Sequence, residues 1–132
     1  MEDRYLFKAK FDDSDRWVKG QLVEVNDTYL IIPNHASKIL AGWFSTSNII
    51  EVKKDTICQC TGLKDKNGKL IWENDIVKIN NSKVNTLITF RDFEIICTIP
   101  NEKYYKHRLE YDTEYEVIGN IFDNPELLES EE

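Results

Sequence analysis

Two carboxylates and a histidine are the side chains of this sequence that are best suited to acid–base chemistry. Glu73 and Asp75 are separated by one residue, and His107 is one of two histidines in the chain. Such groups can share proton transfer when their surroundings separate their pKa values. The segment 73–75 is also typical of a solvated turn, and the sequence has no G-x-S-x-G, Walker A or H-E-x-x-H motif. We therefore assign no catalytic residue, and an enzyme with an unrecognised carboxylate site remains an alternative.

Three cysteines raise the question of a metal site. Cys58 and Cys60 alternate with Gln59, which puts both thiols on one face of a strand. Together with Cys97 and a histidine they could complete a tetrahedral zinc site, although their spacing is not C-x-x-C. An odd number of cysteines in a cytosolic chain more often indicates thiols that serve as small buried apolar residues. We assign no metal and no cofactor, and the sequence leaves metal binding by these cysteines open.

Oxygen-bearing side chains after residue 64 resemble the start of a calcium loop. Asp65 and Asn67 would stand at its first and third positions. Lys69 would then stand at the fifth position and Ile76 at the twelfth, where the loop requires oxygen ligands. The Asn67-Gly68 pair instead predicts a tight β-hairpin with a type I′ turn, in which both residues have positive φ.

Two polar and aromatic segments form the candidate functional surface. The corner at 72–75 combines one large aromatic residue with three polar residues, and hairpin geometry alone explains it least. The segment at 104–108 interleaves aromatic and basic residues, a pattern that can stack nucleobases. The candidate residues are Trp72, Glu73, Asn74, Asp75, Tyr104, Tyr105, Lys106 and Arg108.

The net charge argues against general nucleic-acid binding. The chain carries a formal net charge of −7. Residues 1–54 contain eight Lys/Arg and eight Asp/Glu, whereas residues 55–132 contain nine and sixteen, so the second half holds the whole excess. Acidic surfaces repel phosphate backbones. A nucleic-acid-binding small β-barrel is therefore an alternative that the charge disfavours.

Short strands must position these residues. Period-two alternation and β-branched runs separated by polar turns predict an antiparallel, mainly β fold. The expected strands cover residues 5–11, 17–25, 28–32, 43–44, 49–52, 70–72, 76–79, 84–90, 93–99 and 114–122. Gly20 and Gly119 indicate bulges or close backbone crossings. A helical turn is expected at 37–40, and Asn124-Pro125-Glu126 predicts the start of a short C-terminal helix.

Many short strands in a chain of this length predict a small antiparallel β-barrel or pseudo-barrel. We expect one domain over residues 1–132, which can be divided at the charge step into an N-terminal meander at 1–54 and a barrel at 55–132. No apolar run approaches the roughly 20 residues of a membrane helix, and the N-terminus does not resemble a signal peptide. We expect a cytoplasmic protein without membrane contact.

Three segments carry a family resemblance. They are YLFKAKFDDSDRWVKGQLV at 5–23, TGLKDKNGKLIWENDIVKI at 61–79 and EYEVIGNIFDNPELL at 114–128. Together they resemble the YopX family of small bacteriophage and prophage proteins over nearly the whole chain. Cys58, Cys60, Trp72 and Asn74 depart from the Gly, Tyr, Tyr and Gly that are usual in the family. The resemblance implies a β-rich, barrel-like fold with SH3-like strands, and it implies no catalytic residue.

The function expected from these observations is that of a phage or prophage accessory protein without enzymatic activity. Small β-barrels leave strand edges that other chains can extend. The expected partner is therefore a second copy, giving a homo-oligomer, or a host or phage protein. The expected location is the cytoplasm of the bacterial host.

Overall fold

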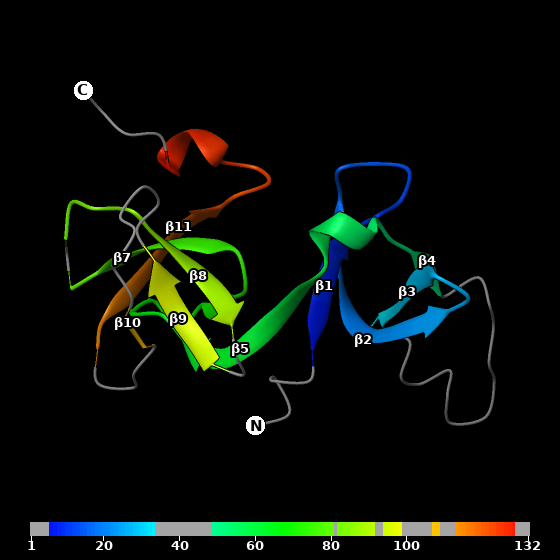
Figure 1. Cartoon of the computed structure of the whole chain (residues 1–132), viewed down its shortest axis with the longest axis horizontal. Helices are drawn as coiled ribbons and strands as arrows, with labels where there is room; N and C mark the ends of the chain where they lie inside the picture. Colours follow the sequence, from blue (N-terminus) through cyan, green and yellow to red (C-terminus); the bar gives the residue numbers. More distant parts are fainter. Residues whose placement is uncertain are drawn as a thin grey trace. The chain divides into compact units, whose positions relative to one another are not determined.

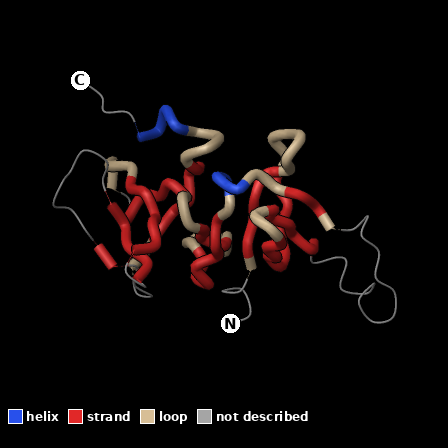
Figure 2. Tube along the Cα trace, turned by 45° about the vertical axis from the view of Figure 1, so that its right-hand side comes forward, coloured by secondary structure: helices blue, strands red, loops and turns tan. Residues whose placement is uncertain are grey.

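The fold is taken from a computed structural model, which describes residues 6–33, 49–80, 82–91, 94–98, 107–108 and 113–128. Of Arg91, His107 and Arg108 only the backbone is described. These residues form eleven strands and two short 3-10 helices, so the protein is mainly β, as predicted (Figures 1 and 2). The helical turn expected at 37–40 and the strand expected at 43–44 lie outside the described residues.

Two compact units divide the chain, one at Met1–Cys60 and one at Thr61–Glu132. The boundary falls inside strand β5 (Cys58–Lys64), a few residues beyond the charge step at residue 54. No separate linker therefore joins the two units, because residues of one strand belong to both.

The first unit is an antiparallel meander. Its strands are β1 (Phe7–Lys10), β2 (Trp17–Val25), β3 (Thr28–Pro33) and β4 (Ile50–Glu51), followed by the 3-10 helix η4 (Lys54–Thr56). These strands belong to a six-stranded sheet of order β4-β3-β2-β1-β5-β6, in which residues 61–64 of β5 and the whole of β6 (Leu70–Trp72) are residues of the second unit. Asn26 and Asp27 connect β2 to β3 with φ of 50° and 65°. Positive φ at both residues is the type I′ geometry that suits the twist of a two-residue hairpin.

The second unit contains the other sheet. Its strands are β7 (Asp75–Ile79), β8 (Thr86–Arg91), β9 (Glu94–Thr98), β10 (His107–Arg108) and β11 (Tyr115–Asn120), and the 3-10 helix η5 (Pro125–Leu128) follows. The sheet order is β10-β9-β8-β7-β11, and the neighbouring strands are antiparallel. The pairing of β11 with β7 shifts register between Val117 and Gly119, which confirms the bulge predicted near Gly119.

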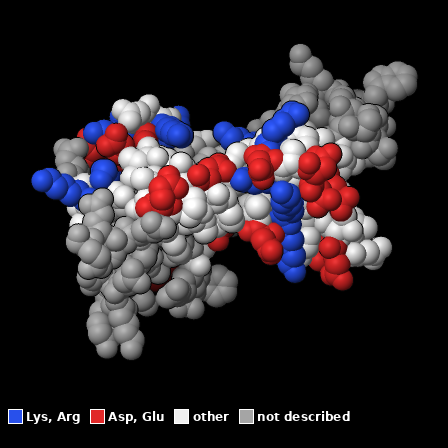
Figure 3. Space-filling model, turned by 90° about the horizontal axis from the view of Figure 1, so that it is seen from above, with Lys and Arg blue, Asp and Glu red and all other residues white. Residues whose placement is uncertain are grey.

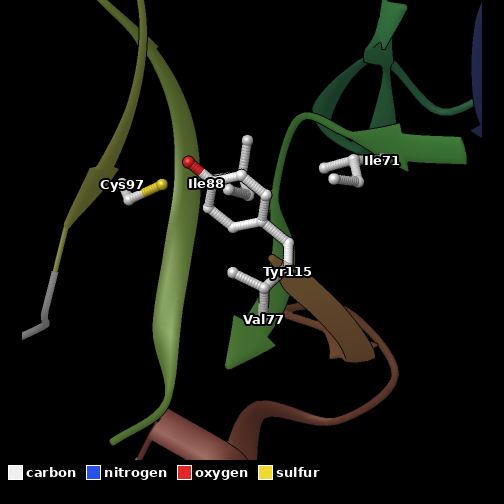
Figure 4. Close-up of a cluster of buried hydrophobic side chains, with 5 residues drawn as sticks. All are labelled: Ile71, Val77, Ile88, Cys97 and Tyr115. Carbon is white, nitrogen blue, oxygen red and sulfur yellow. The ribbon is translucent and has the colours of Figure 1, made fainter. Parts of the chain in front are cut away.

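Each unit has its own core of buried apolar side chains. The first consists of Ala9, Val18, Ile31 and Val52. The second consists of Ile71, Val77, Ile88, Cys97 and Tyr115, where the Tyr115 ring reaches from β11 among its neighbours (Figure 4). Fully burying a valine or isoleucine side chain contributes roughly 1.5–3 kcal/mol to the stability of the fold. The alternation of apolar side chains along each strand therefore determines which of its faces turns toward the core.

The predicted small β-barrel or pseudo-barrel is corrected to two antiparallel sheets, since no closed barrel is found in the described parts of the chain. The sheet of the first unit comes nearest to closure at a single bridge between Phe11 and Val52. The neighbouring bonds are from Asp12 N–H to the Glu51 carbonyl and from Lys53 N–H to the Lys10 carbonyl. Since β4 has only two residues, this contact does not extend into a strand ladder.

The predicted C-terminal helix is also corrected, to the 3-10 turn η5. Asn124 was expected to cap the helix by accepting from the N–H groups that follow it. Its Oδ1 instead accepts from the backbone N–H of Asn120 at 3.2 Å, a residue that precedes the turn in the sequence. The turn is held by a bond from Asn85 Nδ2 to the Leu127 carbonyl at 2.7 Å.

Candidate functional site

The corner at 72–75 is the tight turn between β6 and β7, and its polar groups are engaged within the fold. The Asp75 carboxylate accepts the backbone N–H of Trp72 at 2.8 Å. Trp72 and Asp75 are each only 3% exposed. Glu73 is partly exposed. The buried Asp75 carboxylate thus holds the turn closed through this hydrogen bond, and Glu73 and Asp75 differ in burial.

Asn74 supplies the backbone conformation that the corner needs. Its φ is 72°, a region that glycine enters at the least steric cost and asparagine more readily than most residues. Its N–H donates to the Ile88 carbonyl at 2.8 Å, and its carbonyl accepts from Ile121 N–H at 3.1 Å. Asn74 therefore joins the turn to β8 and to the end of β11. The substitution of the family's usual Gly by Asn is one that this turn accommodates.

The second candidate segment is largely outside the described residues. Tyr104, Tyr105 and Lys106 are not described, and for His107 and Arg108 only the backbone is. The sequence suggested a loop here, whereas residues 107–108 form strand β10 and pair with Cys97 and Ile96. Whether the side chains of Glu73, Asp75 and His107 converge, or whether the segment stacks bases, therefore stays a prediction.

The three cysteines are buried, as predicted for small apolar residues. Cys58 and Cys60 are each 1% exposed and lie at alternate positions of β5, and Cys97 is fully buried in the second core. Burial raises the pKa of the Cys97 thiol to about 12. Within the described part of the chain, no three His, Cys, Asp or Glu residues gather as a group that could hold a metal ion.

The Asp65 carboxylate accepts backbone hydrogen bonds from its own loop and from β11. Asp65 follows β5 and is 7% exposed. Its Oδ1 accepts the N–H groups of Asn67 and Lys69, each at 2.9 Å, and its Oδ2 accepts the N–H of Val117 at 3.0 Å. Burial raises the pKa of Asp65, but these three backbone bonds and the Lys69 charge lower it more, so the pKa lies below its usual value of 3.8.

The loop around Asp65 corrects the turn predicted at Asn67-Gly68. Gly68 has a φ of 82°, whereas Asn67 is not among the residues with positive φ. Gly68 N–H donates to the Asp65 carbonyl at 3.0 Å, and Asp65 N–H donates to the Lys69 carbonyl at 2.7 Å. This arrangement matches a longer hairpin loop in which a turn is followed by one left-handed glycine. The carboxylate of Asp65 selects it by binding the N–H groups of Asn67 and Lys69.

Sequence reasoning missed an apolar surface on the first unit, here named the outer face. It is the side of β2 and β3 that points away from the first core. Its residues are Trp17, Lys19, Gln21, Val23, Val25, Thr28, Leu30 and Ile32. Val25 is 50% exposed, and Val23, Leu30 and Ile32 are partly exposed. The signal was present, because β3 carries apolar residues in both alternating phases, which is typical of a strand covered on two sides.

Charged residues frame the outer face. Lys8 pairs across strands with Lys19, and Lys10 pairs with Trp17. The ammonium groups of Lys8 and Lys10 lie 4.7 Å and 5.4 Å from the centroid of the Trp17 ring, within the range of cation–π attraction. On the opposite side, Glu51 of β4 pairs with Leu30 and is exposed. The face thus has cations beside β1, apolar side chains in the middle and an anion beside β4.

Lys/Arg and Asp/Glu side chains are interspersed over the described residues in the view of Figure 3. None of the helices in the described ranges is long and apolar enough to cross a membrane.

Two antiparallel sheets in two compact units, without a recognised catalytic constellation among the residues described, define a small mainly β protein. The sequence pattern of the YopX protein family matches residues 6–129. The chain therefore belongs to the YopX family, which confirms the resemblance drawn from its sequence segments. A search of curated proteins found no match to the chain.

Proposed function

We propose that this protein is a non-enzymatic accessory protein of a phage or prophage that acts through protein–protein contact, and that its outer face binds the outer face of a second copy. The proposal includes a location in the cytoplasm of the bacterial host, where phage and prophage genes are expressed. The observation that carries it is the apolar centre of the outer face together with the opposite charges at its two sides.

The composition of this face is that of a protein contact. Val23 and Leu30 are direct cross-strand partners, and Ile32 lies beside them on the same side of the sheet. None of the three belongs to the first core cluster or to the apolar residues packed against it. An apolar centre with a polar rim and a large aromatic residue is the usual anatomy of an interface.

The charges favour a second copy as the partner. In a two-fold dimer, residue i of one copy meets residue j of the other, and residue j meets residue i. A face with Lys8 and Lys19 at one side and Glu51 at the other can satisfy both contacts at once. Two sheets can pack face to face with their strands aligned or crossed, so the arrangement does not require free strand edges.

Sedimentation equilibrium over a series of protein concentrations tests the proposal. The unmodified protein is expected to dimerise, and Leu30→Lys is expected to abolish dimerisation, because it puts a cation in the apolar centre. Val84→Lys is the matched control, since Val84 is an exposed apolar residue of the second unit at 45% exposure. A dimer that persists in Leu30→Lys contradicts the outer face as its interface.

A charge exchange makes the test specific for two-fold pairing. Glu51→Lys and Lys19→Glu are each expected to weaken dimerisation, and the double variant is expected to recover part of the loss. A protein that stays monomeric at all concentrations overturns the proposal. The same holds if the monomer binds a host protein that Leu30→Lys no longer retains, because that protein would then be the occupant of the face.

A further inference from the structure

Asn67-Gly68 is the one place in this sequence where asparagine precedes glycine. The side-chain carbonyl of an asparagine can be attacked by the backbone nitrogen of the next residue, which closes a cyclic imide, a succinimide. Glycine at that next position has no Cβ to hinder the attack. Asn67 and Gly68 are both exposed, so water can reach them. The groups needed for spontaneous deamidation are therefore present in the loop 65–69, here named the Asp65 loop.

The deamidation of Asn67 has two steps, and water is its only co-reactant. The Gly68 nitrogen forms a bond to Asn67 Cγ, while the side-chain nitrogen of Asn67 leaves as ammonia and takes up the proton that Gly68 loses. Water then opens the ring at either of its carbonyl groups. Opening at Cγ gives aspartate. Opening at the backbone carbonyl gives isoaspartate, in which the main chain runs through the side chain and is one carbon atom longer.

The Asp65 loop holds Asn67 and Gly68 in a turn. Gly68 N–H donates to the Asp65 carbonyl at 3.0 Å, which closes a turn over residues 65–68. The two central residues are Lys66 and Asn67, and neither is among the residues with positive φ. A hydrogen-bonded turn of this kind is type I, in which the second central residue has a ψ of about 0°. Asn67 is that second central residue.

This turn keeps the two reacting atoms apart. At a ψ of about 0° the Gly68 nitrogen eclipses the Asn67 nitrogen, whereas ring closure requires it to lie beside Asn67 Cβ. Rotation about the Asn67 Cα–C bond would bring it there, but this rotation breaks the bond from Gly68 N–H to the Asp65 carbonyl. Asn67 N–H is also engaged, because it donates to Asp65 Oδ1 at 2.9 Å.

Further hydrogen bonds tie the turn to the rest of the second unit. Lys66 N–H donates to the Tyr115 carbonyl at 2.8 Å, and Val117 N–H donates to Asp65 Oδ2 at 3.0 Å. Asp65 N–H donates to the Lys69 carbonyl at 2.7 Å, and Lys69 N–H donates to Asp65 Oδ1 at 2.9 Å. The conformation that reacts is therefore opposed by several hydrogen bonds rather than by one.

We propose that Asn67 is a site of spontaneous deamidation that the native fold keeps unreacted and that reacts in chains whose second unit is unfolded. The modification then marks those chains. Isoaspartate at position 67 lengthens the main chain between Asp65 and Lys69, whose mutual hydrogen bonds depend on the length of the loop. A chain modified while unfolded therefore refolds to a less stable second unit. The proposal depends on contacts within the second unit and not on the outer face.

The experiment compares deamidation of the full chain at mildly alkaline pH in native buffer and in guanidinium chloride. Chromatography of proteolytic peptides separates the asparagine, aspartate and isoaspartate forms, and mass spectrometry identifies them. Asn67 is expected to react at least about tenfold more slowly in native buffer, which corresponds to an opening cost of at least about 1.4 kcal/mol. Asn26 is the internal reference, because it is also exposed but is followed by Asp27, whose side chain hinders attack in both solutions.

Gly68→Ala tests the chemical route in guanidinium chloride, where its effect on folding does not matter. The added Cβ is expected to make the reaction of Asn67 several-fold slower than in the unmodified unfolded chain. Across a series of denaturant concentrations, Asn67 is expected to become reactive together with the thiol of Cys97, which is fully buried in the second core. Equal rates in native buffer and in denaturant overturn the proposal. So do an unchanged rate in Gly68→Ala and a reaction of Asn67 at denaturant concentrations that leave Cys97 unlabelled.

Refolding tests the expected effect of the modification on stability. Chains incubated in denaturant are refolded, the isoaspartate form is isolated, and its urea unfolding midpoint is measured. Asn67→Asp is the matched control, because it carries the new charge without the additional main-chain atom. The isoaspartate form is expected to unfold at a lower urea concentration than Asn67→Asp. Equal midpoints overturn the assigned effect of loop length.

Discussion

At the scale of single residues, Asp65 illustrates how one side chain can organise backbone that is distant in sequence. Its carboxylate binds the N–H groups of Asn67 and Lys69 in its own loop and that of Val117, which is 52 positions away. The sequence placed Asp65 at the first position of an apparent calcium loop. The oxygen atoms that would serve a cation are instead occupied by backbone donors, and the loop takes its shape from them.

The lowered pKa of Asp65 leads to a prediction about acid stability. A group whose pKa is lower in the folded state contributes stability that is present above its unfolded pKa and is lost as the pH falls through its folded pKa. The contribution of Asp65 is therefore complete at neutral pH and declines below the ordinary value of 3.8. Asp65→Asn is expected to lower the free energy of unfolding by about 1–3 kcal/mol at pH 7 and by less at pH 3.

Urea unfolding of both proteins at the two pH values measures this difference. Asp55→Asn is the control, because Asp55 is an exposed residue of η4 and its substitution is expected to change stability by less than about 0.5 kcal/mol. A stability difference that is the same at pH 7 and pH 3 contradicts the assigned role of the carboxylate.

At the scale of elements, alternation predicted the strands well and turn chemistry predicted their connections less well. The strands at 17–25 and 70–72 match their predicted bounds, because polar turn residues stand directly before and after both runs. The type I′ turn was expected at Asn67-Gly68 but occurs at Asn26-Asp27. The turn type of a hairpin depends on the length of its loop. The length of the loop at 65–69 depends on the hydrogen bonds of the Asp65 side chain, and the residue pair Asn67-Gly68 alone does not indicate them.

The elements of the candidate site were predicted only in part. The polar corner at 72–75 was found from its composition, but the burial of Asp75 depends on the packing of β6 and β7. The outer face was missed because apolar residues on both sides of β3 were read only as strand propensity. The hydrogen bond between Val117 N–H and the Asp65 carboxylate could not have been predicted, because the two residues are 52 positions apart and no sequence pattern links them.

Gly20 provides a prediction for the packing of β2 against β3. A Cβ atom at Gly20 would collide with the backbone carbonyl of Ile32 and lie 2.9 Å from Pro33 Cα, which confirms the close crossing predicted there. Gly20→Ala must therefore move one strand, with an expected cost of about 1–3 kcal/mol. Thermal unfolding monitored by circular dichroism measures this loss of stability.

Gly68→Ala is the comparison for Gly20→Ala. A Cβ at Gly68 meets no atom within 4 Å, but the φ of 82° is unfavourable for alanine. The expected cost is about 1–2 kcal/mol and arises from backbone conformation alone. Gly68→Asn is expected to recover part of that loss, whereas Gly20→Asn is expected to be worse than Gly20→Ala. Equal behaviour of the two positions contradicts the steric explanation.

At the scale of the whole molecule, the three cysteines report separately on the two units. Cys58 and Cys60 belong to the first unit and Cys97 to the second, and each is at most 1% exposed. Thiol labelling is therefore expected to require opening of the unit that holds the cysteine. The raised pKa of Cys97, about 12, keeps its thiol protonated at neutral pH and slows labelling further.

Labelling in increasing urea, with the modified peptides identified by mass spectrometry, follows the opening of each unit. All three thiols are expected to be unreactive in the native protein and reactive once it is unfolded. Labelling of Cys58 and Cys60 also checks whether Leu30→Lys remains folded, because this substitution and both thiols lie in the first unit. Rapid labelling of Cys97 in native conditions contradicts its place in the second core.

Strand β5 has a consequence for how this chain can change during evolution. Modules that are joined by a loose linker can be exchanged between genes with little regard for the exact junction. Here the junction lies within a strand that pairs with β1 through Gln59 and Cys58. A recombination point displaced by one residue would turn every later side chain of β5 to the opposite face. The two halves of the gene are therefore expected to be inherited together. A viable exchange between relatives must keep each later side chain of β5 on its original face of the sheet.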